Sequence, residues 1–91
     1  MLALLVPGSP AQALTADECN RNRDEFLQSI EENRRNGVQR LEAELAQVRD
    51  PTRRDLLARE VDELWEFEES MRAVGDQMFR DCMRQLREEK S

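Results

Sequence analysis

The stretch Arg49-Asp50-Pro51-Thr52 decides the fold, because Asp50-Pro51 is the one strong helix-breaking signal in the middle of the chain. Cys19 lies 31 residues before Asp50, Cys82 lies 31 residues after Pro51, and there is no other cysteine. If two helices fold back on each other at this point, the two sulfur atoms meet. The sequence therefore predicts an all-α, antiparallel two-helix hairpin, similar to a coiled coil and closed by a Cys19–Cys82 disulfide.

Apolar residues recur at helical spacing on both sides of this break. The first helix is expected over about residues 16–49, where Thr15-Ala16-Asp17-Glu18 reads as a capping box. The turn is expected over about 49–52, and the second helix over about 52–89. The second helix starts either with Asp50 as N-cap or, one turn later, with Thr52. The hairpin then occupies residues 14–91, and its apolar stripes are Cys19, Phe26, Ile30, Gly37, Leu41, Leu45 and Val48, facing Leu57, Val61, Leu64, Met71, Gly75, Met78, Cys82 and Leu86.

Pairing the two cysteines fixes a register in which the numbers of facing residues sum to about 101. Gly75 then faces Phe26, and Gly37 faces Leu64 and Trp65. A glycine inside a helix costs about 1 kcal/mol relative to alanine, so both glycines are expected to make room for a large side chain. The same register sets Ile30 opposite Met71, Leu41 opposite Val61, Leu45 opposite Leu57, Arg34 beside Glu68 and Arg40 beside Glu60.

Two other arrangements of the cysteines remain open. One long helix kinked at Pro51 could dimerise antiparallel, with Cys19 bonded to Cys82 of the other chain. Alternatively, both thiols could stay reduced in a cytosolic protein, since disulfides persist mainly in oxidising compartments.

Residues 1–13 resemble the end of a secretory signal peptide. The apolar run 2–6 is followed by a Pro-Gly break, and Ala11 and Ala13 are small residues at the positions that signal peptidase accepts. The run is short and has no basic residues before it, as a start codon assigned too late would explain. We expect 1–13 to be a signal-peptide remnant or a disordered leader, and the protein to be periplasmic or secreted. The alternative is a cytosolic leader on a coiled-coil adaptor.

The composition excludes several classes of function. Asp and Glu number 20 against 14 Lys and Arg, the net charge is −6, and no basic cluster occurs, so a nucleic-acid partner is not expected. The chain has no histidine and no tyrosine, which removes the commonest general base and zinc ligand. We predict a non-enzymatic protein without a cofactor. No stretch approaches the ~20 apolar residues of a membrane span, so no integral membrane segment is expected.

The second helix has a wider apolar arc than a two-helix seam requires. We predict that this extra surface faces a partner, and that the partner is a second copy, which gives a homodimeric four-helix bundle. A groove for a client or partner helix is the alternative. The predicted partner-facing residues are Trp65, Phe67, Val74, Phe79 and Met83.

Three kinds of metal site were considered, and none is predicted. Monovalent copper prefers soft ligands, so a copper-buffering or copper-sensing protein is the alternative function from another class. Zinc held by four thiolates from two chains lacks the usual histidine. Oxygen ligands on a convex helix face do not converge on a hard cation, so the acidic residues are expected to be solvated. The copper candidates are Met71, Met78, Cys82 and Met83, and the outward acidic residues are Asp62, Glu66 and Glu69.

The organisation loosely resembles the small stress-responsive helical-hairpin chaperones of Gram-negative periplasms. Those proteins carry a Leu-Thr-x-x-Gln motif, and the segment Leu14-Thr15-Ala16-Asp17-Glu18 departs from it at the last position. The match is short and has no second copy, so we assign no family. From the residues alone we predict an exported interaction protein with a chaperone-like, inhibitory or envelope-scaffold role.

Overall fold

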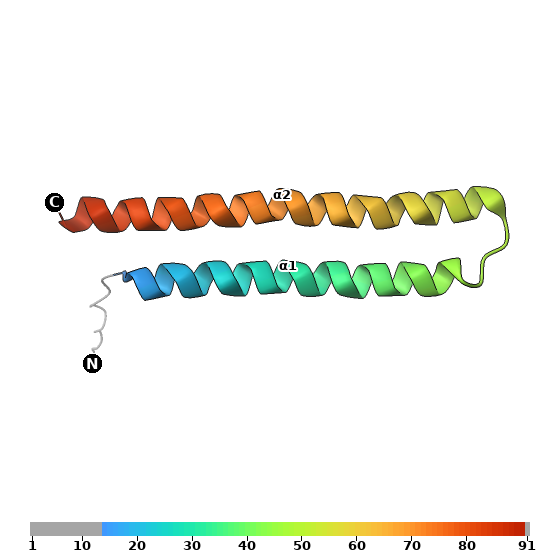
Figure 1. Cartoon of the computed structure of the whole chain (residues 1–91), viewed down its shortest axis with the longest axis horizontal. Helices are drawn as coiled ribbons and strands as arrows, with labels where there is room; N and C mark the ends of the chain where they lie inside the picture. Colours follow the sequence, from blue (N-terminus) through green and yellow to red (C-terminus); the bar gives the residue numbers. More distant parts are fainter. Residues whose placement is uncertain (1–13, 91) are drawn as a thin grey trace, which may run out of the picture.

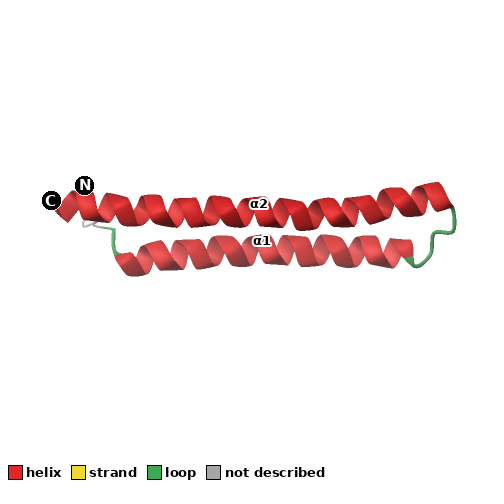
Figure 2. Cartoon of the chain, turned by 45° about the horizontal axis from the view of Figure 1, so that its top comes forward, coloured by secondary structure: helices red, strands yellow, loops and turns green. Residues whose placement is uncertain are grey.

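The structure of the chain, a computed structural model, describes residues 14–90 and consists there of two α-helices. Helix α1 spans Ala16–Leu45 and helix α2 spans Pro51–Lys90. They lie side by side and antiparallel, so that the start of α1 and the end of α2 share one end of the molecule (Figures 1 and 2). The predicted all-α hairpin is confirmed. The leader predicted for residues 1–13 lies outside the described residues.

The capping box that was predicted from the sequence opens α1. The backbone N–H of Glu18 donates to Thr15 Oγ1 at 3.1 Å, and the backbone N–H of Thr15 donates to Glu18 Oε1 at 3.0 Å. Two of the N–H groups that a helix start leaves without partners are thereby satisfied. The hairpin therefore has a defined first residue in Ala16.

Helix α1 ends at Leu45, earlier than the predicted residue 49, and the connection occupies residues 46–50. Pro51 begins α2 and disfavours helical backbone at residue 50, and residues 46–49 leave the helix where Arg54 of α2 binds the carbonyl oxygens of Leu45 and Val48. Asp50 is the N-cap: its Oδ2 accepts from the backbone N–H of Arg53 at 2.9 Å. Of the two starts considered for the second helix, the structure has the one at Asp50.

The end of α1 is completed by side chains from α2. The last turn of α1 has no basic residue of its own to bind its free carbonyls. Arg54 Nη1 donates to the carbonyl oxygen of Leu45 at 2.7 Å and to that of Val48 at 2.9 Å. Beside it, Arg53 Nη2 donates to Glu44 at 2.6 Å, and this hydrogen bond raises the pKa of the Arg53 guanidinium. The turn is thus tied to both helices.

At the opposite end, Cys19 and Cys82 form a disulfide within the one chain, with their Cα atoms 5.8 Å apart. This excludes, for this structure, both the reduced thiols and the interchain bond. The glycines lie as the register predicted: a Cβ on Gly75 would come within 3.0 Å of the Phe26 ring.

One detail of the register differs from the prediction. A Cβ on Gly37 would meet Leu64 Cδ1 at 2.8 Å, so Gly37 makes room for Leu64 and not for Trp65. Of the two predicted charged pairs, the first is present: Arg34 Nε binds Glu68 Oε1 at 3.1 Å. Arg40 and Glu60 line one hollow, yet no ion pair joins them in the described part of the chain.

The core is one narrow seam between the helices. The prediction placed Met78 in this seam, but Met78 is 45% exposed, and the partly buried Phe79 takes its place between Gly75 and Cys82. The seven residues from Gly75 to Cys82 divide into steps of four and three through Phe79, where the prediction divided them into three and four through Met78. The buried apolar side chains are Cys19, Ile30, Val38, Leu41, Leu57 and Leu86.

Candidate interaction surface

The five residues predicted to face a partner lie on two opposite flanks of α2. An α-helix turns by about 100° per residue, so residues two apart point to nearly opposite sides. Trp65 and Phe67 therefore lie on either side of the seam. Val74, seven residues after Phe67, shares its flank, whereas Phe79 and Met83 fall on the flank of Trp65.

Arginines of α1 cover the aromatic rings on the Trp65 flank. The Arg34 guanidinium carbon lies 4.0 Å from the centre of the Trp65 ring, and that of Arg23 lies 4.2 Å from the centre of the Phe79 ring. Guanidinium groups at this distance are attracted to the negative face of the ring. This flank therefore already has contacts within its own chain.

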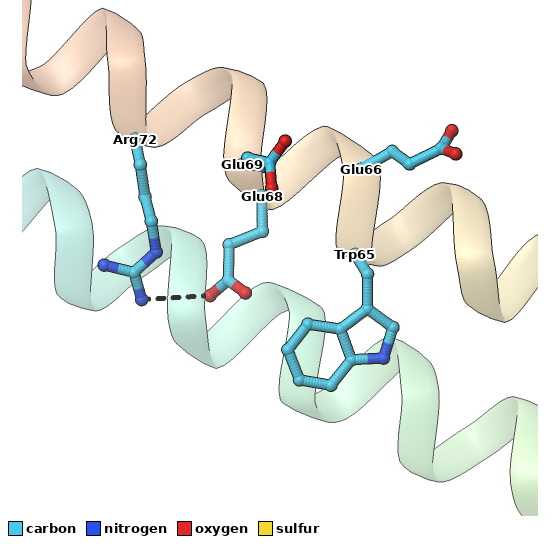
Figure 3. A pocket seen from close by; sticks show the side chains of 5 residues that line it. All are labelled: Trp65, Glu66, Glu68, Glu69 and Arg72. Atoms are coloured by element: carbon cyan, nitrogen blue, oxygen red, sulfur yellow. Dashed lines mark hydrogen bonds and ion pairs between the residues drawn. The ribbon is translucent and has the colours of Figure 1, made fainter.

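A buried carboxylate fixes one of these arginines. Glu68 is only 4% exposed, and it binds Arg34 at 3.1 Å and Arg72 at 3.4 Å. Figure 3 shows Glu68 and Trp65 reaching from α2 toward α1, with Glu66 pointing away. Because a buried charge needs partners, both arginines pair with the Glu68 carboxylate at the seam, and this pairing holds the Arg34 guanidinium over the Trp65 ring. A shallow pocket beside them is lined by Trp65, Glu66, Glu68, Glu69 and Arg72.

The other flank carries an uncovered apolar row, which we call the α2 stripe: Leu56, Phe67, Val74 and Met78. Their exposed fractions are 45%, 58%, 44% and 45%. The steps between them are 11, 7 and 4 residues, each close to a whole number of helical turns, so all four share one line along α2. Phe67 and Val74 were predicted to face a partner, whereas Leu56 and Met78 were missed. The same spacing in the sequence could have found them.

Two hollows between the helices open along this stripe. Phe67 borders one together with Arg40 and Glu60, and Met78 borders the other together with Asn22 and the disulfide. The line from Asn22 to Arg40 on α1 runs by helical steps through Ser29 and Asn33. Arg40 is its one charged member. On α2 itself, Glu60 and Glu63 line the hollow beside Phe67, so the uncharged border of the stripe is confined to its α1 side.

The candidate metal ligands do not gather in one place. Cys82 is bonded to Cys19, so it offers no thiolate. Met78 and Met83 are five residues apart and point about 140° from each other around α2. Asp62, Glu66 and Glu69 are exposed, and no cluster of acidic, cysteine or histidine side chains suited to a metal occurs within residues 14–90.

Comparison with protein-family models, curated proteins and solved structures finds no match to this chain. In the described part, neither helix has an apolar stretch that could cross a membrane. The surface must therefore be interpreted from its own chemistry.

Proposed function

We propose that this chain is an exported, non-enzymatic interaction protein that binds a partner helix with the α2 stripe. The observation that carries this proposal is the difference between the two flanks of α2. A guanidinium of α1 lies over the Trp65 ring and another over the Phe79 ring, although Trp65 stays 48% exposed, whereas within the described residues no arginine lies over the Phe67 ring, which is 58% exposed. Phe67, Val74 and Met78 follow one another at helical steps as an exposed apolar row, which is typical of a docking surface, whereas Glu60 and Glu63 separate this row from Leu56.

The free energy available from burying the α2 stripe is sufficient for specific binding. Burying a large apolar side chain contributes about 1.5–3 kcal/mol. The members of the stripe are about half exposed. Completing their burial therefore offers roughly 1 kcal/mol each, before the partner contributes its own side chains. Residues at helical spacing, next to a shallow groove, fit a helix better than an extended peptide.

Export is supported by the disulfide. A bond between Cys19 and Cys82 persists in an oxidising compartment such as a periplasm, and reductants of the cytosol would break it. Mass spectrometry of the protein from its native host tests this part of the proposal. A mature chain beginning at Leu14 with an intact disulfide is the expected result, and an uncleaved chain with two free thiols would contradict export.

Photocrosslinking in the native host tests the docking surface. A benzoylphenylalanine at position 67 is expected to give a crosslinked band of defined mass, and Val74→Asp in the same chain is expected to remove it. Position 65 is the matched control, because Trp65 is exposed to a similar degree on the other flank of α2. Equal crosslinking from both positions, or none from 67, would overturn the proposal.

A further inference from the structure

The two end members of the α2 stripe lie at equal distances on either side of Phe67, whereas Val74 has Glu60 as its counterpart. Leu56 lies 11 residues before Phe67, and Met78 lies 11 residues after it, with all three half exposed on one flank. A row with this symmetry can pair with an antiparallel copy of itself, as a two-fold interface requires. We infer that the partner is a second copy of this chain, seated antiparallel on the stripe with the two-fold axis at Phe67. This inference rests on the proposed docking function of the stripe.

The register follows from the axis, because facing residues of the two α2 helices have numbers that sum to 134. Phe67 then meets Phe67 of the second copy, and Leu56 meets Met78 at both ends of the interface. Val74 lies over the aliphatic stem of Glu60, whose carboxylate reaches the solvent. All four members of the stripe are thereby covered by one partner.

Charge favours this register over its neighbours. It sets Arg53, on the same flank as the stripe, opposite Asp81 of the second copy. A shift that pairs Phe67 with Val74 gives a sum of 141 and places Glu60 against Asp81, two like charges at each end. A shift that pairs Phe67 with Met78 gives a sum of 145 and leaves Leu56 against Glu89. Of these three registers, the one with its axis at Phe67 pairs Leu56 with Met78 and Phe67 with itself, sets Val74 against the stem of Glu60, and places no two acids opposite each other along the stripe.

The same two-fold axis also relates the α1 helices of the two copies. Since Arg34 lies beside Glu68 within each chain, the axis passes α1 near residue 34. Asn33 and Asn36 are the nearest α1 residues toward the stripe flank. A carboxamide both donates and accepts hydrogen bonds, so amides from two identical chains can pair with each other. The two hairpins then stack as a four-helix bundle with α2 on α2 and α1 on α1.

Cysteine crosslinking of the purified, natively oxidised protein tests the register. Phe67→Cys alone is expected to form a covalent dimer on mild oxidation. In chains that keep Phe67, an equimolar mixture of Leu56→Cys with Met78→Cys is expected to crosslink, whereas neither variant does so alone. Trp65→Cys is the control on the opposite flank. Seating in the dimer gives an effective thiol concentration in the mM range, so at ~10 µM protein crosslinking should be about 100-fold faster than for the control.

Light scattering on the unmodified chain completes the test. A mass of two chains together with the predicted crosslinks supports the inference. A monomer at ~100 µM overturns it, because specific protein–protein interfaces bind much more tightly than ~100 µM. A dimer without these crosslinks also overturns it. A different protein photocrosslinked from position 67 would contradict the inferred homodimer but would still support the proposed docking function. The experiments therefore test the homodimer and the docking function separately.

Discussion

Reducing the Cys19–Cys82 bond is the most informative perturbation of this hairpin. The bond joins residues 63 apart and lies at the end of the molecule away from the turn. Without it, the ends of both helices are held only by side-chain packing along one narrow seam. We expect the reduced hairpin to be largely unfolded as a monomer at 25 °C.

The loss of unfolding free energy on reduction follows from the length of the loop that the disulfide closes. A cross-link of this kind removes conformational entropy from the unfolded chain, and for a separation of 63 residues the chain-entropy relation gives about 4 kcal/mol. The core that opposes unfolding is small, with six buried apolar side chains. Small domains have a total stability of only about 5 kcal/mol or less, so losing this contribution removes most of it.

The assay is urea unfolding followed by circular dichroism at 222 nm, on oxidised protein, on reduced protein and on a Cys19→Ser/Cys82→Ser double variant. The double variant should match the reduced protein, and adding reductant to it should change nothing. Each curve is measured at two protein concentrations, because self-association stabilises the folded state by mass action. Unfolding free energies that differ by less than about 1 kcal/mol between the oxidised and reduced forms would refute the chain-entropy reasoning.

Three further substitutions test the seam and the start of α2, each by urea unfolding of the oxidised protein. Glu68→Gln leaves the α1 arginine that it binds without a charged partner and should lower the unfolding free energy by about 2 kcal/mol, whereas the exposed neighbour Glu69→Gln should change it by less than about 0.5. Gly75→Val pushes a branched side chain into the aromatic ring of α1 and should cost about 1–3 kcal/mol, while Ala73→Val on the solvent side carries only the helix-propensity penalty; equal losses would contradict close packing at the glycine. Asp50→Ala removes the cap of α2 and should cost about 1 kcal/mol, and an unchanged midpoint would show that the proline alone defines the start of the helix.

The sequence predicted the hairpin well because its strongest signals are local or symmetric. Asp50-Pro51 marks the reversal, Thr15 and Glu18 mark the first helix start, and the two cysteines fix the register that joins them. The early end of α1 was not predicted. It depends on Arg54 binding carbonyls across the turn, and such a contact leaves no periodic signal in the sequence.

The candidate surface was predicted only in part, because apolar periodicity does not say which flank of a helix is covered. Trp65 and Phe67 look equivalent as residues beside the seam. The structure separates them by placing Arg34 over one ring and nothing comparable over the other. Met78 was assigned to the seam because steps of three and four fit the interval from Gly75 to Cys82 in either order, and the sequence does not say whether Met78 or Phe79 is the buried one.

The hydrogen bonds that Arg54 makes across the turn have a consequence for how the hairpin forms. Its bonds to Leu45 and Val48 span nine and six residues, whereas the two sulfur atoms are 63 residues apart. Short loops close at the least entropic cost, so contacts should spread like a zipper from the turn toward the open end. Cys19 is synthesised long before Cys82 and has no other cysteine in its own chain with which to mispair. Cys19 therefore stays a free thiol until helix pairing brings Cys82 next to it. Until then, it can form a disulfide only with a thiol of another molecule.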